Sequence, residues 1–180
     1  EPLFRCNLAC AGCGKIDYPK EILNQRLSVQ ECIDSVEECG APIVSIPGGE
    51  PLIHKEMPDI VRELIKRKKF VYLCTNAVLM EKKLSDYKPS SYFTWSVHLD
   101  GMKDEHDKAV CQDGVFDRCI SAIKKAKSLG FRCNVNCTIF DTAEEGALKK
   151  FLNYVTDELK VDGITISPGF AYERAPDQEH

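Results

Sequence analysis

The chain has 180 residues, of which 43% are hydrophobic and 29% are charged, and this is enough apolar content for one substantial core. Its formal net charge of -4 argues against a polyanionic partner, so we expect no binding of nucleic acid. The ten cysteines come without a secretory signal, and no apolar run approaches the length of a membrane span. Because free cysteines are typical of a reducing compartment, we expect a cytoplasmic protein.

Strand and helix patterns alternate along the chain. A short strand is predicted over residues 1–6, followed by a helix that opens with Ser28 and Glu31 in capping-box spacing and stops at Gly40. Further strands are predicted over 41–46, 70–77, 92–101, 131–140 and 161–169, and further helices over 57–69, 80–87, 116–130 and 144–159. Six such alternations predict parallel strands joined by helical crossovers. We expect one domain over residues 1–180, truncated at both ends.

Side-chain alternation in the later strands favours a barrel over an open sheet. The strand over 92–101 alternates apolar with polar residues, and the strands over 131–140 and 161–169 repeat this pattern. A parallel sheet covered by helices on both faces should carry near-continuous apolar strands, so a polar face indicates an interior that is not packed core. We therefore predict an α/β fold, a partial (β/α)6 TIM-like barrel with its site at the carboxyl ends of the strands.

Three cysteines follow the first predicted strand directly. Cys6, Cys10 and Cys13 stand in C-x3-C-x2-C spacing, in a glycine-containing loop at the rim of the predicted barrel. A structural zinc site requires four ligands. The nearest further candidates are Cys32, on the apolar stripe of a predicted helix, and His54, about forty residues beyond the loop, and neither fits such a site. Three thiolates on a [4Fe-4S] cluster would leave one iron open to bind a substrate or cofactor. We favour this interpretation over zinc or a disulfide.

This cysteine motif resembles the signature of the radical S-adenosylmethionine (radical SAM) superfamily, and the resemblance covers the whole chain. It implies a [4Fe-4S] cluster held by Cys6, Cys10 and Cys13, with S-adenosyl-L-methionine as the second cofactor. The segment "PGGEP" is similar to the family's glycine-rich segment, whose backbone and glutamate receive the amino end of S-adenosylmethionine. "SVHLDG" resembles the family's segment near the ribose. The implied cofactor-binding residues are Gly48, Gly49, Glu50, Pro51, Asn76, Ser96, Asn136, Thr138 and Ser167.

One position departs from the family pattern. The residue before the last cysteine, commonly aromatic and packed against the adenine, is Gly12 in this chain. Adenine packing would then come partly from elsewhere.

Longer blocks, such as "EPLFRCNLACAGCGKI" and "SPGFAYERAPDQEH", resemble the branch of the superfamily that acts in hopanoid biosynthesis. This implies addition of a 5′-deoxyadenosyl radical to the side-chain alkene of diploptene, with an external reductant such as flavodoxin or ferredoxin. An apolar substrate leaves room for peripheral contact with a membrane on its cytoplasmic face. Two alternatives stay open: a radical SAM enzyme that abstracts hydrogen from another substrate, and an iron–sulfur or zinc module for electron transfer.

The remaining cysteines and histidines receive individual interpretations. Cys74 faces the interior of the predicted barrel and is a candidate hydrogen-atom donor to the product radical, with a small buried apolar residue as the alternative. His98 also faces inward, either toward a ligand or as a structural histidine, whereas His106 is expected at the surface. Glu173 and Arg174 follow the last strand at the rim, where they form a surface ion pair or anchor S-adenosylmethionine. Cys111 has no assigned role, and we expect five further cysteines in the core: Cys32, Cys39, Cys119, Cys133 and Cys137.

Overall fold

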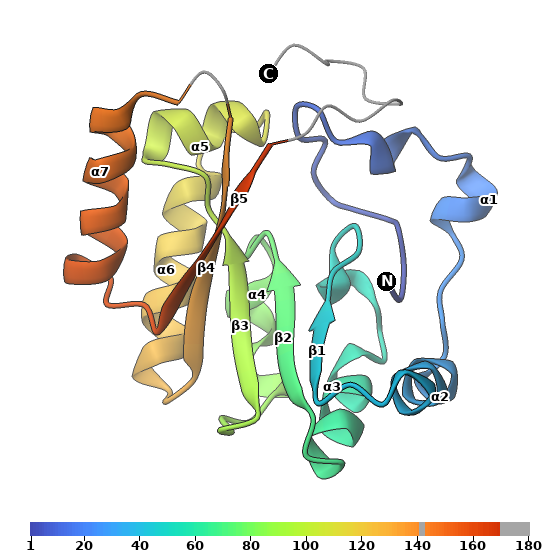
Figure 1. Ribbon diagram of the computed structural model, residues 1–180. Helices are drawn as coiled ribbons and strands as arrows, with labels where there is room; N and C mark the ends of the chain where they lie inside the picture. Colours follow the sequence, from blue (N-terminus) through green and yellow to red (C-terminus); the bar gives the residue numbers. More distant parts are fainter. Residues whose placement is uncertain (141–142, 170–180) are drawn as a thin grey trace.

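The computed structural model describes residues 1–140 and 143–169 and contains one sheet of five parallel strands. The strands are β1 (Ile43–Ile46), β2 (Phe70–Thr75), β3 (Phe93–His98), β4 (Arg132–Ile139) and β5 (Gly163–Pro168). They pair in the order β1-β2-β3-β4-β5, so each strand lies beside its predecessor in the chain and the sheet curls into a half-barrel (Figure 1). Sequential order of this kind is what successive right-handed crossovers produce.

Helices connect the strands and cover the convex face of the sheet, where α3, α4 and α6 lie behind the strands in Figure 1. The helix α2 begins at a complete capping box of Ser28 and Glu31 and ends at Gly40, which has a φ of 65°. The helical elements are listed here with their bounds: η1 (Gly14–Asp17), α1 (Lys20–Leu23), α2 (Val29–Cys39), η2 (Pro51–Ile53), α3 (Met57–Lys66), α4 (Met80–Lys83), η3 (Leu84–Asp86), α5 (Lys103–Ala109), α6 (Val115–Ser128), α7 (Glu145–Asn153) and η4 (Tyr154–Glu158), which is a π-helix.

The core lies between the strands and these helices. In each central strand every second residue is buried against the helices, and the register keeps these residues side by side across the sheet. Trp95 is fully buried at the centre, in edge-to-face contact with Tyr87, Phe93 and Phe131. The alternate residues of β2 and β4 point to the concave face and are only half-buried, apart from the exposed Phe70 and Arg132 at the strand starts.

One sequence prediction about the elements is wrong, and one helix was missed. The first predicted strand does not form: Leu3 makes only an isolated bridge to Arg26, and the carbonyls of Leu3 and Arg5 accept hydrogen bonds from Gly49 and Glu50 beyond the end of β1. The sheet therefore has five strands instead of six. The helix α5, which was not predicted, lies between β3 and α6.

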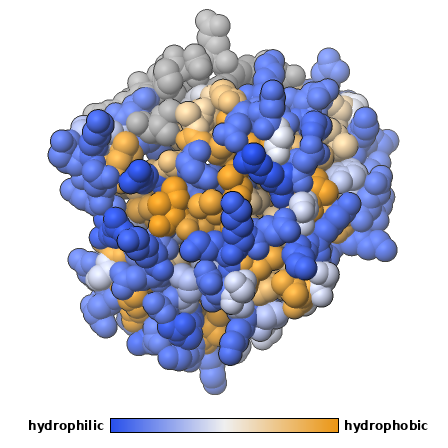
Figure 2. All heavy atoms as spheres, turned by 180° about the vertical axis from the view of Figure 1, so that it is seen from behind, coloured by the Kyte–Doolittle hydropathy of each residue, from blue (hydrophilic) through white to orange (hydrophobic). Residues whose placement is uncertain are grey.

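The face opposite to that of Figure 1 is mostly hydrophilic, with hydrophobic atoms showing across its middle (Figure 2). Among the residues that the structure describes, no helix is long and apolar enough to cross a membrane.

Candidate functional site

The loop that carries Cys6, Cys10 and Cys13 brings their three thiols into one neighbourhood. All three side chains are partly buried. Burial raises the pKa of Cys10 to about 12, and the neighbouring Cys13 and Cys6 add to this shift because three thiolates would repel one another. Burial also raises the pKa of Cys6. Over residues 1–140 and 143–169, no three His, Cys, Asp or Glu side chains are already arranged around a metal position. The donor set fits three ligands of an iron–sulfur cluster, whose positive iron would favour the thiolates.

Backbone hydrogen bonds hold the cysteine loop on two sides. On one side, Gly49 donates its backbone N–H to the carbonyl of Leu3 at 3.2 Å, and Glu50 donates to the carbonyl of Arg5 at 2.9 Å. On the other side, Ala11 donates to the carbonyl of Ala109 at the end of α5, at 3.0 Å. The cysteines are therefore held between the turn after β1 and the helix after β3.

The glycines of "PGGEP" are needed because another segment of the chain packs directly against them. A Cβ atom on Gly49 would lie 2.2 Å from the carbonyl oxygens of Phe4 and Arg5, and one on Gly48 would lie 2.6 Å from that of Leu3. These are contacts with backbone, which cannot move aside as a flexible side chain can. The family resemblance assigned these glycines to close approach of the turn's backbone to S-adenosylmethionine. In the structure, the segment leading into Cys6 lies against them.

Glu50 is completely buried at the start of η2. Its Oε1 accepts hydrogen bonds from the backbone N–H of Leu52 at 3.0 Å and from the Thr75 hydroxyl at 2.9 Å, and its Oε2 accepts one from the backbone N–H of Asn76 at 2.8 Å. Burial raises the pKa of Glu50, whereas these three hydrogen bonds lower it. The adjacent Pro51 is buried in the first turn of η2.

Asn76 follows β2 and joins this carboxylate to the cysteine loop. Its Nδ2 lies 2.8 Å from Oδ1 of Asn7 and 3.7 Å from the sulfur of Cys6. The backbone N–H of Leu8 also donates to this sulfur, at 3.5 Å. The structure thus brings together two of the predicted residues, Asn76 and Cys6.

The other residues predicted for cofactor binding lie along the concave face of β3, β4 and β5. In the register of the sheet, Ser96 pairs with Asn134, Asn136 pairs with His98, and Thr138 pairs with Ser167. Ser96 is buried, whereas Asn136, Thr138 and Ser167 are partly exposed. Glu173 and Arg174 lie outside the described residues.

A pair of polar side chains closes the carboxyl end of β3. His98 Nε2 lies 2.7 Å from Oδ2 of Asp100, and Oδ1 of the same carboxylate accepts the backbone N–H of Thr138 at 2.7 Å. Burial lowers the pKa of His98, but the hydrogen bond to Asp100 and the charge of that carboxylate together outweigh burial and raise the pKa overall. His98 is thus an oriented imidazole on the concave face.

The prediction that His106 lies at the surface is wrong. His106 belongs to α5 and is 1% exposed, because this side chain faces inward from a helix whose other residues are mostly polar. Burial and the nearby charge of His98 lower the pKa of His106 to about 4. Its Nδ1 accepts the backbone N–H of Asp100, so Nε2 carries the proton and faces the sulfur of Cys119 at 3.8 Å.

The cysteines outside the loop mostly follow prediction. Cys32, Cys119, Cys133 and Cys137 are buried, but the expectation for Cys39 is wrong: it is exposed at the carboxyl end of α2, beyond the two residues that this helix buries. Cys111 is exposed. Cys74 is partly buried on the concave face of β2, with its sulfur 3.4 Å from Oγ of Ser45.

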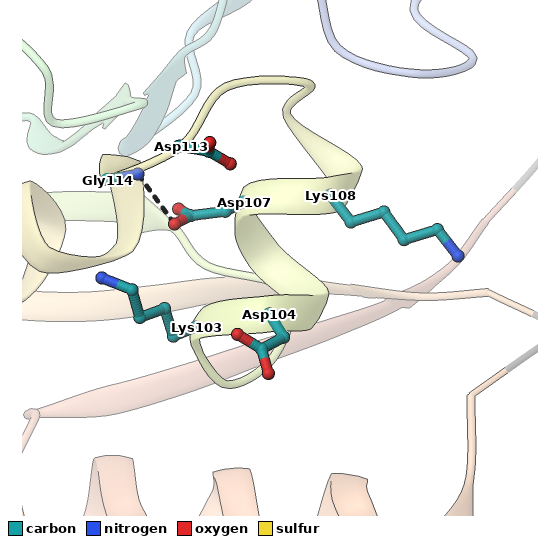
Figure 3. A pocket seen from close by; sticks show the side chains of 6 residues that line it. All are labelled: Lys103, Asp104, Asp107, Lys108, Asp113 and Gly114. Carbon is teal, nitrogen blue, oxygen red and sulfur yellow. Dashed lines mark hydrogen bonds between the residues drawn. The ribbon is translucent and has the colours of Figure 1, made fainter.

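A pocket of about 610 Å³ lies between α5 and the start of α6 (Figure 3). It is lined by Lys103, Asp104, Asp107, Lys108, Asp113 and Gly114, none of which was predicted for the site. Asp107 accepts the backbone N–H groups of Gly114 and Phe116, both at 2.8 Å, and thereby caps α6. We interpret this pocket as part of the α5–α6 connection.

Solved structures share this fold. Streptococcus suis SuiB superimposes with a TM-score of 0.81 at 18% identity, over 99% of this chain and 41% of that one. Methylornithine synthase (PylB) gives a TM-score of 0.71 at 15% identity, over 99% of this chain and 55% of that one. At these identities the likeness concerns the fold.

Curated relatives and a family model match the sequence itself. The chain is similar to the GTP 3′,8-cyclase of Limosilactobacillus fermentum, with 28% identity over 160 residues, and to that of Clostridium perfringens, with 25% over 155 residues. It spans about half the length of these relatives, since the alignments cover 85% and 83% of this chain and 48% of each relative. The model of the radical SAM superfamily matches residues 1–155, and the chain therefore belongs to the radical SAM superfamily.

Proposed function

We propose that this chain is the core domain of a longer radical SAM enzyme, an adenosyl transferase of the adenosylhopane synthase type. A [4Fe-4S] cluster and S-adenosylmethionine are the cofactors of its superfamily, and we assign the cluster to Cys6, Cys10 and Cys13. One observation carries this assignment: the loop of these cysteines lies beside the end of β2, where the Asn76 amide faces the sulfur of Cys6 at 3.7 Å. Hydrogen bonds to sulfur are one means by which proteins tune such clusters.

The concave face supports an apolar substrate. Its carboxyl end is polar. At the amino end, Phe70 is 43% exposed beside its register partner Ile43, which is 57% exposed, and we call this pair the apolar end. The charged Arg132 lies further along the same edge, at the start of β4. Cys74 is the fourth residue after Phe70, about 13 Å further along β2. An elongated hydrocarbon such as diploptene could lie on the apolar end while its alkene reaches the polar end.

Cys6, Cys10 and Cys13 would hold the cluster. With one electron from a reductant such as flavodoxin or ferredoxin, cleavage of a carbon–sulfur bond of S-adenosylmethionine would release methionine and supply a 5′-deoxyadenosyl radical. Addition of this radical to an alkene leaves a carbon radical on the product, which needs a hydrogen atom. We assign its delivery to Cys74, whose thiol lies on the concave face between the cysteine loop and the apolar end. A thiol S–H bond is weaker than the C–H bond that would form. The transfer would leave a thiyl radical on Cys74, and one electron from the same reductant together with a proton would restore the thiol.

The test uses the full-length protein, reconstituted with iron and sulfide without oxygen and mixed with S-adenosylmethionine, reductant and diploptene. Mass spectrometry should detect the adenosyl–hopane adduct, and the Cys74→Ala variant should consume S-adenosylmethionine but release less of the saturated adduct. Free 5′-deoxyadenosine as the main product would contradict adenosyl transfer. One zinc per chain would contradict radical chemistry altogether.

A second candidate follows from the similarity to GTP 3′,8-cyclases. In it, the same radical would abstract hydrogen from a nucleotide instead of adding to an alkene. Replacing diploptene by GTP in the same assay separates the two candidates, because only the second yields free 5′-deoxyadenosine in proportion to GTP consumed.

A further inference from the structure

A buried carboxylate lies between the end of β2 and the segment that carries Cys6. Glu50 has no exposed surface, and both of its oxygens are engaged by donors from this chain, at Leu52, Thr75 and Asn76. A ligand's ammonium group has no open side from which to approach this carboxylate. The carboxyl group of Glu50 therefore interacts with groups of this chain, namely two backbone N–H groups and the Thr75 hydroxyl.

We propose that Glu50 is a positioning residue for the iron–sulfur loop, which acts through Asn76 on the sulfur of Cys6 instead of binding the amino group of S-adenosylmethionine. This inference deepens the proposed function and rests on its assignment of the cluster to the loop of Cys6.

The orientation of Asn76 makes the connection specific. The backbone N–H of Val78 donates to Oδ1 of Asn76 at 3.1 Å, and a backbone N–H can only donate, so Oδ1 must face Val78. The Nδ2 group is then left to face Cys6 and Asn7. Because Glu50 holds the backbone N–H of the same residue, it fixes the point from which this amide reaches the sulfur.

A second connection runs through the backbone. The N–H of Glu50 donates to the carbonyl of Arg5, the residue before Cys6, and the N–H of Gly49 donates to Leu3. The absence of a side chain at Gly49 lets this segment pass within contact distance. Glu50 thus meets the cysteine segment both through its own backbone and through Asn76, and a shift of Glu50 would move Cys6 from two sides.

The experiment compares Glu50→Gln, Asn76→Ala and the double variant of the full-length protein, reconstituted without oxygen. Iron and sulfide per chain and the electron paramagnetic resonance spectrum of the reduced cluster are measured before S-adenosylmethionine is added, and its affinity is measured afterwards by calorimetry. The exposed Glu56→Gln is the matched control.

We expect Glu50→Gln and Asn76→Ala each to alter the spectrum in the absence of S-adenosylmethionine and to weaken iron retention about ten-fold. The double variant should lose no more iron than the more strongly affected of the two single variants, because Glu50 and Asn76 act in series. Glu56→Gln should match the wild type.

A wild-type spectrum and iron content in Glu50→Gln, combined with a ten-fold loss of affinity for S-adenosylmethionine, would overturn the inference in favour of direct binding. Failure of the wild-type protein itself to take up iron would instead overturn the proposed function. If Glu50→Gln does not fold, Thr75→Val serves as the test, since it removes one donor to Glu50 at nearly constant volume. An altered spectrum in Thr75→Val supports the inference, and an unaltered one overturns it.

Discussion

At the scale of single residues, Gly49 and Gly146 offer a matched pair. A Cβ on Gly49 would meet two backbone oxygens at 2.2 Å, whereas one on Gly146, in α7, would meet nothing within 4 Å. Gly49→Ala should therefore lower the free energy of unfolding by about 2 kcal/mol. Gly146→Ala should raise it by about 0.5–1 kcal/mol, because alanine favours the helix. Urea denaturation checks both, and equal effects at the two positions would contradict the close packing at Gly49.

The buried His106 predicts a pH dependence of stability. With its pKa lowered to about 4, His106 is neutral in the folded chain, while the unfolded chain binds a proton below pH 6.5. Unfolding is therefore favoured as the pH falls from 6.5 to 4, by up to about 3 kcal/mol at the acid end. Above pH 6.5 His106 has no such effect.

The variant His106→Asn keeps an acceptor for the backbone N–H of Asp100 but cannot titrate. Its free energy of unfolding should decline less than that of the wild type between pH 6.5 and 4, as measured by urea denaturation at several pH values. Parallel declines in both proteins would show that groups other than His106 are responsible.

At the scale of elements, the end of α3 contains a backbone strain that can be relieved. Lys68 follows the helix with a φ of 58°, a left-handed conformation that glycine adopts without penalty. Lys68→Gly should raise the free energy of unfolding by about 0.5–1 kcal/mol. Lys68→Ala, which keeps the Cβ, should leave it nearly unchanged. A thermal melt of each variant distinguishes them, and a loss of stability in Lys68→Gly would refute the prediction.

The elements that the sequence predicted correctly are those with a strong hydrophobic period. The strand β3 alternates cleanly around Trp95, and α2 is delimited by Ser28 and Gly40. The helix α5 escaped prediction because "KDEHDKA" has no apolar stripe, and a histidine takes the inward position. The first strand was predicted from composition, but its carbonyls find partners in the turn after β1, which no local pattern reveals.

The site was partly predictable for the same reason. The spacing of Cys6, Cys10 and Cys13 and the pairing of glycines with Glu50 are local signals, so both segments could be recognised. The partners of Glu50 could not be foreseen, because Thr75 and Asn76 lie 25 and 26 residues further on and meet it only through the crossover of α3. The sequence was enough to select the cysteines and Glu50 as candidates, but only the tertiary structure shows that Thr75 and Asn76 are the partners of Glu50.

At the scale of the whole molecule, the concave face carries polar residues at its carboxyl end and the exposed pair of Phe70 and Ile43, the apolar end, at the starts of β1 and β2. Under the proposed function, Phe70→Ser should raise the KM for diploptene about ten-fold, since half-burial of a phenylalanine against a substrate contributes about 1–1.5 kcal/mol. Cleavage of S-adenosylmethionine without substrate should be unchanged. Leu129→Ser, which alters a similarly exposed side chain after α6, serves as the control, and steady-state kinetics of the full-length protein provide the measurement. Equal KM values for the two variants would exclude the apolar end as a substrate surface.

The cysteine loop is hydrogen-bonded to Ala109 on one side, and the segment that leads into it is hydrogen-bonded to Gly49 and Glu50 on the other. The loop therefore connects α5 to the turn after β1. A cluster that rigidifies the loop would also restrict the motion of both of these segments. The amide protons of Ala11 and Glu50, which form these two connections, should then exchange with deuterium more slowly in the iron-loaded protein than in the iron-free protein, and by a common factor.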